Sequence, residues 1–133
     1  MKYLIVAMAA LLVIAPTASA SPSNAMQPAN VYFGQVKSGQ HPERVVTVRN
    51  PTGSSVTITR FLIAGAGGKK FTLVGSDGTT QASCHVGTTL RPGGSCTIIE
   101  RVKTTAPEYW QAVVSVWYAG GQFNGGVYAH VVA

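Results

Sequence analysis

Two cysteines, Cys84 and Cys96, are the feature that most constrains how this chain folds. They are the only cysteines in the 133-residue sequence, so only one intramolecular pairing exists. They follow an N-terminal segment of the kind that directs export, and disulfides persist in exported proteins. We therefore predict a Cys84–Cys96 disulfide, closing a loop that contains the turn at residues 91–94.

Residues 1–20 have the three parts of a secretory signal peptide. Lys2 supplies a positive charge, residues 4–15 form a continuous apolar run, and residues 18–20 read Ala-Ser-Ala, a small-residue cleavage site. The apolar run is too short to span a bilayer comfortably, so an uncleaved anchor is the less favoured alternative. We predict that the mature chain is periplasmic or secreted and has no membrane span.

Charged residues are few and scattered along the chain. There are ten Lys or Arg and four Asp or Glu, a formal net charge of +6. Lys69 and Lys70 make the longest basic run. Because a nucleic-acid-binding protein normally carries a clustered basic stripe on a recognisable module, the sequence does not support nucleic acid as a partner.

The mature chain is predicted to form one all-β domain. Residues 21–30 contain Pro22 and Pro28 and are expected to be a flexible leader, which leaves residues 31–133 as the domain. Runs of Val, Ile, Thr, Tyr and Phe are separated there by Gly, Pro and Asn, and no long window shows a helical stripe. About seven strands are expected, in a β-sandwich. The candidate segments are 31–36, 44–49, 56–63, 71–74, 82–86, 96–103, 111–118 and 127–132.

The third of these segments has an irregular alternation. Val56 and Ile58 share one face, whereas Phe61 and Ile63 share the other. A one-residue bulge at Thr59–Arg60 would place both pairs in the core, and a strand covered on both faces is the alternative. The predicted core between two sheets is Phe33, Val46, Val48, Ile58, Phe71, Leu73, Ile98, Val114 and Val116.

Several segments, taken in order, resemble the ASH family (abnormal-spindle and hydin-like domains), more specifically its bacterial choice-of-anchor D version. The matching residues are Phe33–Val36 with Gly39, Val46–Asn50 with Gly53, Val56–Thr59, Phe71 after a Gly-rich loop, Cys84, Leu90–Ile98 and Ala112–Val116. The resemblance covers nearly the whole mature chain. It implies an immunoglobulin-like β-sandwich related to PapD-like and major-sperm-protein domains, with no enzyme activity.

The chain departs from the family pattern after Ile98. The family's strand continues there with alternating apolar residues, but this chain has Glu100 and Val102. A carboxylate that faces a core is costly unless it is paired, and Glu is rarely fully buried. We expect Glu100 to be solvated or edge-facing. The alternatives are a bulge that turns it outward and a partner such as Arg60.

No group of residues forms a recognisable catalytic or metal site. The histidines are isolated and are His41, His85 and His130. The only aspartate, Asp77, lies in a Gly-Ser-Asp-Gly turn. The cysteines and His85 lack the paired spacing of structural zinc sites. We expect no catalytic residue, metal or cofactor.

The favoured function is an exported module that recognises a protein partner, by strand addition at a sheet edge or through loops. The alternative is a structural subunit of a surface assembly or fibre. Because aromatic residues often anchor interfaces, Tyr109, Trp110 and Tyr118 are predicted as the contact surface. Trp117 is the better candidate for a core tryptophan, so truncating Trp110 is expected to leave stability nearly unchanged.

Overall fold

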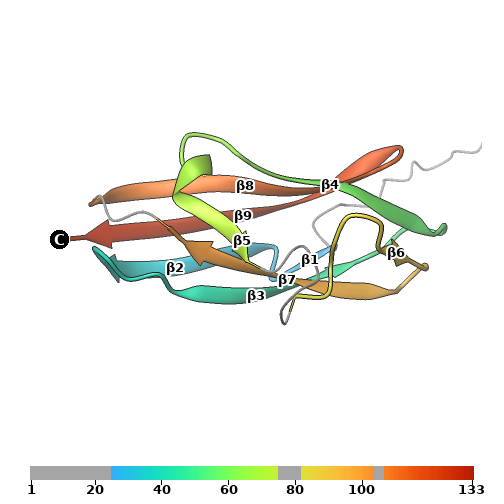
Figure 1. The fold of residues 1–133 in the computed structure, drawn as a ribbon, viewed down its shortest axis with the longest axis horizontal. Coiled ribbons are helices and arrows are strands. Elements are labelled where there is room, and N and C mark those ends of the chain that lie inside the picture. The colour runs from blue at the N-terminus through green and yellow to red at the C-terminus, as the bar shows by residue number, and fades with distance from the viewer. Residues whose placement is uncertain (1–24, 75–81, 104–106) are drawn as a thin grey trace, which may run out of the picture.

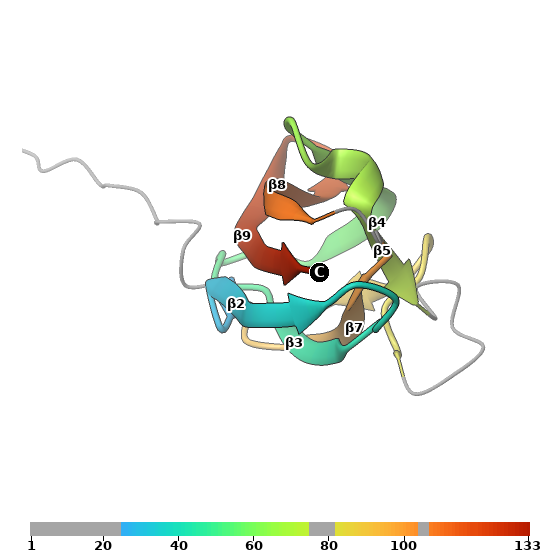
Figure 2. The ribbon, with the colours of Figure 1, turned by 90° about the vertical axis from the view of Figure 1, so that its left-hand side faces the viewer.

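Two β-sheets face each other in the computed structural model, which describes residues 25–74, 82–103 and 107–133 (Figure 1). The four-stranded sheet has the order β1 (Met26–Gln27), β3 (Glu43–Arg49), β7 (Ser95–Val102), β5 (Phe71–Val74). The five-stranded sheet has the order β2 (Asn30–Lys37), β9 (Gly121–Val132), β8 (Glu108–Tyr118), β4 (Val56–Ala64), β6 (Thr89–Leu90). Figure 2 shows β8 and β9 on one side of the interior and β3 and β7 on the other. The all-β sandwich expected from the sequence is confirmed.

The strands agree with the sequence prediction except near the N-terminus, around the first cysteine and at the starts of the last two strands. β8 begins at Glu108, three residues before the predicted segment, and β9 begins at Gly121, six residues before it. Residues 82–86 form no strand, although the backbone N–H of Cys84 donates to the carbonyl oxygen of Thr97 at 2.9 Å. The short strands β1 and β6 were not predicted. β1 changes the expectation of a flexible leader, because Ala25 and Met26 are fully buried and Met26 pairs with Val48. The signal peptide and residues 21–24 lie outside the described residues.

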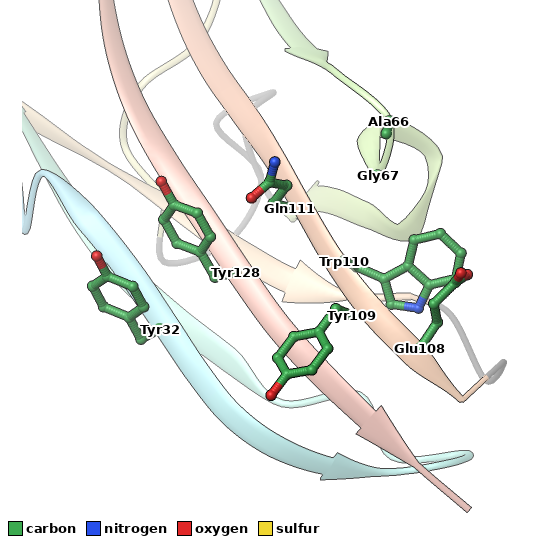
Figure 3. Close-up of a pocket in the computed structure, with 8 residues that line it drawn as sticks. All are labelled: Tyr32, Ala66, Gly67, Glu108, Tyr109, Trp110, Gln111 and Tyr128. Carbon is green, nitrogen blue, oxygen red and sulfur yellow. The ribbon is translucent and has the colours of Figure 1, made fainter.

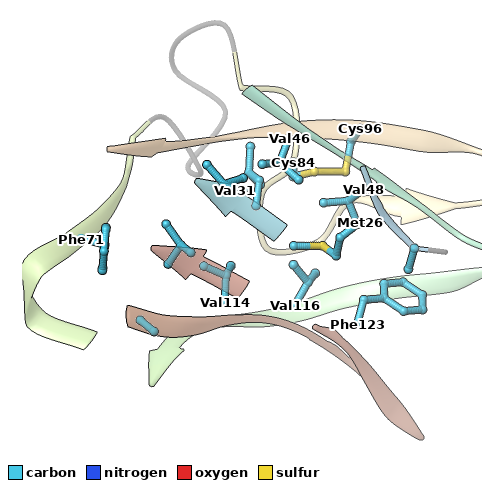
Figure 4. Close-up of a cluster of buried hydrophobic side chains, with 14 of the residues drawn as sticks. Met26, Val31, Val46, Val48, Phe71, Cys84, Cys96, Val114, Val116 and Phe123 are labelled. Atoms are coloured by element: carbon cyan, nitrogen blue, oxygen red, sulfur yellow. A yellow bond between two sulfur atoms is a disulfide. The ribbon is translucent and has the colours of Figure 1, made fainter. Parts of the chain in front are cut away.

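The core lies between the sheets and contains every residue predicted for it. Eight of the nine are buried, and the ninth, Leu73, is partly buried and packs against the others. The predicted disulfide between Cys84 and Cys96 is present, and both cysteines belong to the same cluster (Figure 4). Among the described residues, no helix is long and apolar enough to cross a membrane.

The predicted bulge in β4 is also confirmed. Ile58 lies opposite Tyr118 and Arg60 lies opposite Trp117, so Thr59 is the extra residue on β4. Beyond the bulge, Phe61 and Ile63 are partly buried against the core. The extra residue therefore corrects the phase of the alternation, as the sequence pattern required.

Asn50 joins two loops at one end of the sandwich. It is fully buried, and its side-chain Nδ2 donates to the carbonyl oxygens of Ser54 at 2.8 Å and Leu90 at 2.9 Å. Its Oδ1 accepts from the backbone N–H and the hydroxyl of Thr52, at 2.9 and 2.6 Å. Both donor hydrogens of this amide and its oxygen are therefore hydrogen-bonded inside the protein, which offsets the cost of burying the side chain.

Glu100 faces the core, so the expectation of a solvated or edge-facing side chain is wrong. It lies on the central strand β7 in phase with Ile98 and Val102, and it is 2% exposed. Arg60 is not its partner, because the Arg60 guanidinium lies over the Trp117 ring, 4.7 Å from the centroid. Glu100 Oε1 has no hydrogen-bond partner among the described residues. Burial raises the pKa of Glu100 from its ordinary 4.5 to about 7.

We expect Glu100→Gln to stabilise the protein at pH 8 and to leave it unchanged at pH 4. Below pH 4.5 the carboxyl is protonated in both the folded and unfolded chain; between 4.5 and about 7 only the unfolded chain loses its proton, so folded stability falls. The pKa difference corresponds to about 3 kcal/mol of unfolding free energy. Urea unfolding at both pH values measures it, with the exposed Glu108→Gln as control. Equal effects of the two variants at pH 8 would contradict the burial of Glu100.

Truncating Val48 to Ala is expected to lower the free energy of unfolding by roughly 1 to 4 kcal/mol, because a buried side chain is lost and a cavity is left. Val48 is fully buried on β3, whereas Val45 on the same strand is 55% exposed. Val45→Ala is therefore the matched control and should cost no more than about 0.5 kcal/mol. Denaturant unfolding of both variants tests the register of β3. A larger loss of unfolding free energy for Val45→Ala than for Val48→Ala would refute this register.

Candidate binding surface

The hairpin of β8 and β9 forms the centre of the candidate surface. Valines and alanines alternate with polar and aromatic residues along both strands, so one face of each packs on the core. The strands are joined by the two-residue loop Ala119–Gly120, and Gly120 has a φ of +99°, which glycine adopts without strain. Tyr118 then lies opposite Gly121, and this pairing sets the register of the whole hairpin.

Two pairs of nearly parallel rings stand on the outer face of the five-stranded sheet. Tyr32 of β2 lies opposite Tyr128 of β9, and their ring centroids are 4.8 Å apart with an interplanar angle of 12°. Tyr109 of β8 lies opposite His130 of β9, with centroids 4.0 Å apart and an angle of 11°. Each pair therefore joins two strands side by side, and the three strands together carry both pairs.

A groove of about 550 Å³ lies along these rings (Figure 3). Its lining residues are Tyr32, Ala66, Gly67, Glu108, Tyr109, Trp110, Gln111 and Tyr128. A second hollow, of about 270 Å³, adjoins it and shares its three tyrosines. The second hollow is lined by Tyr32, Gly34, Gln35, Tyr109, Tyr128, Ala129 and His130. We call the two hollows together the aromatic groove.

Two glycines leave room for the groove. A Cβ on Gly126 would lie 2.8 Å from the Tyr128 hydroxyl and 2.5 Å from Asn30 Oδ1. A Cβ on Gly67 would lie 2.6 Å from the backbone oxygen of Gln111. Real Cβ atoms do not approach other atoms so closely, so the absence of side chains lets the Tyr128 ring and the loop after β4 take their places.

Among the described residues, the lining of the aromatic groove contains no Lys or Arg. Glu108, at one end, is the only carboxylate among these lining residues. Lys70, whose Nζ lies 4.7 Å from the ring centroid of the lining residue Trp110, contacts that ring. Lys37 follows the lining residue Gln35 by two positions on β2. The polar groups that the groove offers are mostly phenols, amides and one imidazole.

The structure brings together two of the three residues predicted as contacts. Tyr109 and Trp110 both line the groove (Figure 3). Their side chains lie on opposite sides of β8, and Tyr109 is 75% exposed. Tyr118 lies at the opposite end of β8 and packs on Phe123, with ring centroids 4.7 Å apart. The contact role of these residues stays a prediction.

The sequence analysis missed Tyr32, Tyr128 and His130 as parts of one surface. Tyr128 and His130 alternate with the buried Val127, Ala129 and Val131. This alternation indicates from the sequence that His130 faces outward, and the same signal applies to Tyr128. The parallel pairing of β2 with β9, which brings Tyr32 to Tyr128, joins segments nearly a hundred residues apart and leaves no local sequence signal.

The two tryptophans exchange the roles expected from the sequence. Trp110 is partly buried and packs against the core cluster. Trp117 lies on the outer face under Arg60, and its indole Nε1 is buried without a hydrogen-bond partner in the described part of the chain. The bulge in β4 places Arg60 opposite Trp117 and so helps to cover that ring.

The histidines occupy three separate places. His41 Nδ1 donates to the Val102 carbonyl at 3.0 Å, and His85 Nδ1 donates to that of Val86 at 2.9 Å. His130 stacks on Tyr109. In residues 25–74, 82–103 and 107–133, no three His, Cys, Asp or Glu side chains gather as a metal site would need. Asp77 lies outside the described residues.

Solved structures share this fold at low sequence identity. The VesB protease of Vibrio cholerae matches with a TM-score of 0.55 and 18% identity, over 84% of this chain and 32% of VesB. The secreted serine protease VesC of the same organism matches with 0.55 and 15%, over 79% of this chain and 24% of VesC. The human CEP192 ASH/PapD-like domain (PapD-like domain 7) matches with 0.54 and 10%, over 94% of this chain and 96% of the domain.

These similarities establish the fold alone. No protein-family model and no curated protein sequence matches the chain. This chain spans only 32% of VesB and 24% of VesC, but nearly the whole CEP192 domain. The ASH/PapD-like sandwich implied by the sequence resemblance is therefore confirmed, and the narrower resemblance to choice-of-anchor D domains stays a prediction.

The packing of Trp110 reverses the expected effect of its truncation. Trp110→Ala is now expected to cost roughly 1 to 3 kcal/mol of unfolding free energy, because it removes core packing and the ring under Lys70. Tyr109→Ala is the matched control, since this neighbouring ring is largely exposed and should cost no more than about 0.5 kcal/mol. Thermal and urea unfolding of both variants measure the two losses of unfolding free energy. Two small and equal losses would contradict the packing of Trp110 against the core.

Proposed function

We propose that this chain is an exported, non-catalytic binding module that recognises a protein partner in the cell envelope or outside the cell. The observation that carries the proposal is the free edge of β2. This strand is eight residues long and ends the five-stranded sheet, and among the described strands of that sheet it pairs only with β9. Unpaired backbone groups on such an edge can bind an extended segment of another protein.

The geometry of β2 limits where a partner strand can pair. A register shift separates Tyr32 from Gln35, and Gly34 within it has a φ of +68°. Such a bulge interrupts regular pairing. A partner strand would therefore pair along residues 30–32 or along residues 35 and 36, since the Lys37 N–H already donates to Gln40 Oε1 at 3.2 Å. Tyr32, which is 67% exposed, supplies an aromatic anchor beside the first of these segments.

Export is supported by the disulfide, because such bonds persist outside the reducing cytosol. The absence of catalysis is proposed from the histidines, since His41 and His85 are engaged with backbone carbonyls and His130 with an aromatic ring. A general base must instead reach a nucleophile or a substrate proton.

The alternative, a subunit of a surface fibre, has less support from the fold. A subunit that takes a donor strand from its neighbour needs a gap in its own sandwich. Here the C-terminal strand β9 pairs on both sides, with β2 and β8, and its residues Val127 and Val131 lie in the chain's own core.

Photo-crosslinking in the producing cells tests recognition at the β2 edge. Benzoylphenylalanine in place of Tyr32 or Lys37 is expected to capture one discrete protein. The same group in place of Val45, which is exposed on the other sheet, is the control and should capture none. Adducts from all three positions alike, or from Val45 alone, would contradict the proposal.

A further inference from the structure

We propose that the aromatic groove binds a neutral oligosaccharide. This site lies on the outer face of β8 and β9 and goes beyond protein recognition at the β2 edge. The two proposals share Tyr32, Gly34 and Gln35 of β2. Each can still fail without the other, because the groove is tested at Tyr109 and Tyr128 and the β2 edge at Lys37.

The spacing of the rings suits a chain of sugar rings. Tyr128 and His130 are two residues apart on β9, so the two stacked pairs lie in rows roughly 7 Å apart along the strand. Within each row the two rings are within 12° of parallel and cover one face of each other, so a sugar would pack on the ring faces and edges that this stacking leaves uncovered. A pyranose is of comparable length, so consecutive sugars of one oligosaccharide can meet consecutive rows.

The chemistry of the lining matches the two kinds of surface on a sugar. A pyranose has apolar C–H faces, which pack on aromatic rings, and hydroxyl groups around its edge, which both donate and accept hydrogen bonds. The groove supplies tyrosine rings for the faces. Gln111 and Gln35 supply amides, which donate and accept together, and the tyrosine hydroxyls do the same.

The charge of the groove favours a neutral ligand. The full chain carries a formal net charge of +6, yet in the part of the chain that the structure describes no Lys or Arg lines either hollow. Phosphate, sulfate and carboxylate groups are bound by such cations. An anionic glycan or a nucleic acid would meet the repelling charge of Glu108 at one end, whereas the nearby Lys70 Nζ lies over the Trp110 ring, 4.7 Å from its centroid, and is not among the lining residues.

The size and rigidity of the groove favour a small ligand over a protein surface. A volume of about 550 Å³ lies within the range of small-molecule sites, whereas a stable protein interface needs a much broader contact. Tyr128 is held by Tyr32 on its ring face and fits over Gly126, so its position is set before a ligand binds. Such preorganisation lowers the entropic cost of binding.

Titration calorimetry with four neutral probes, cellohexaose, xylohexaose, chitohexaose and maltohexaose, tests the proposal. At least one probe is expected to bind the unmodified protein at micromolar to millimolar concentration. Tyr109→Ala and Tyr128→Ala should each weaken binding at least about tenfold, the loss expected for one aromatic stacking contact. Val45→Ala, on the other sheet, should bind as the unmodified protein does. Because Tyr109 is largely exposed, its variant keeps the test decisive if Tyr128→Ala fails to fold.

Four results would overturn the proposal: no probe binds at millimolar concentration, binding survives both tyrosine variants, high salt abolishes it, or dextran sulfate is preferred. A photo-crosslinker in place of Tyr109 that captures a protein, with no probe binding, would assign the groove to a protein instead. Crosslinking from Lys37 is independent of these results, so failure at the groove is distinguishable from failure of recognition at the β2 edge.

Discussion

The position of β9 between β2 and β8 is the constraint on which the rest of the five-stranded sheet depends. β9 pairs in parallel with β2 and antiparallel with β8 along nearly their whole lengths. This pairing turns Val127, Ala129 and Val131 into the core and leaves Tyr128 and His130 outside. A slip of one residue would exchange the two sets, so burial of the small apolar residues also holds the aromatic rows in place.

The core combines one stabilising crosslink with one costly group. By the chain-entropy model, a loop of the size closed by Cys84 and Cys96 contributes about 3 kcal/mol, mainly by restricting the unfolded chain. Burial of Glu100 opposes folding by a similar amount at neutral pH, because its carboxyl must either stay protonated or be ionised in an apolar place. β7 lies between β3 and β5, and the Glu100 side chain on it is 2% exposed.

Local patterns predicted those parts of the fold that depend on the alternation of residues. The phase change after Ile58 predicted the bulge, because a strand with one buried face must return its apolar residues to the core. Glu100 was predicted wrongly because the general rarity of buried carboxylates was preferred to the phase of β7, which places Glu100 with Ile98 and Val102. The leader was misread because residues 25–27 are held by pairing with β3, and nothing in their own composition indicates this.

The sequence by itself determined the sandwich class, the single disulfide and the inward face of each long strand, because these follow from residue type and from the two-residue period of a strand. Only the tertiary structure decided which tryptophan meets the core and which aromatic residues share a surface. Tyr32 meets Tyr128, and Tyr109 meets His130, through pairings between strands. Tyr109 and His130 belong to one hairpin whose register depends on its turn, and Tyr32 arrives by a parallel pairing across nearly the full chain. The register between strands that are far apart in the sequence is set by packing of the whole core, so no local sequence pattern predicts it.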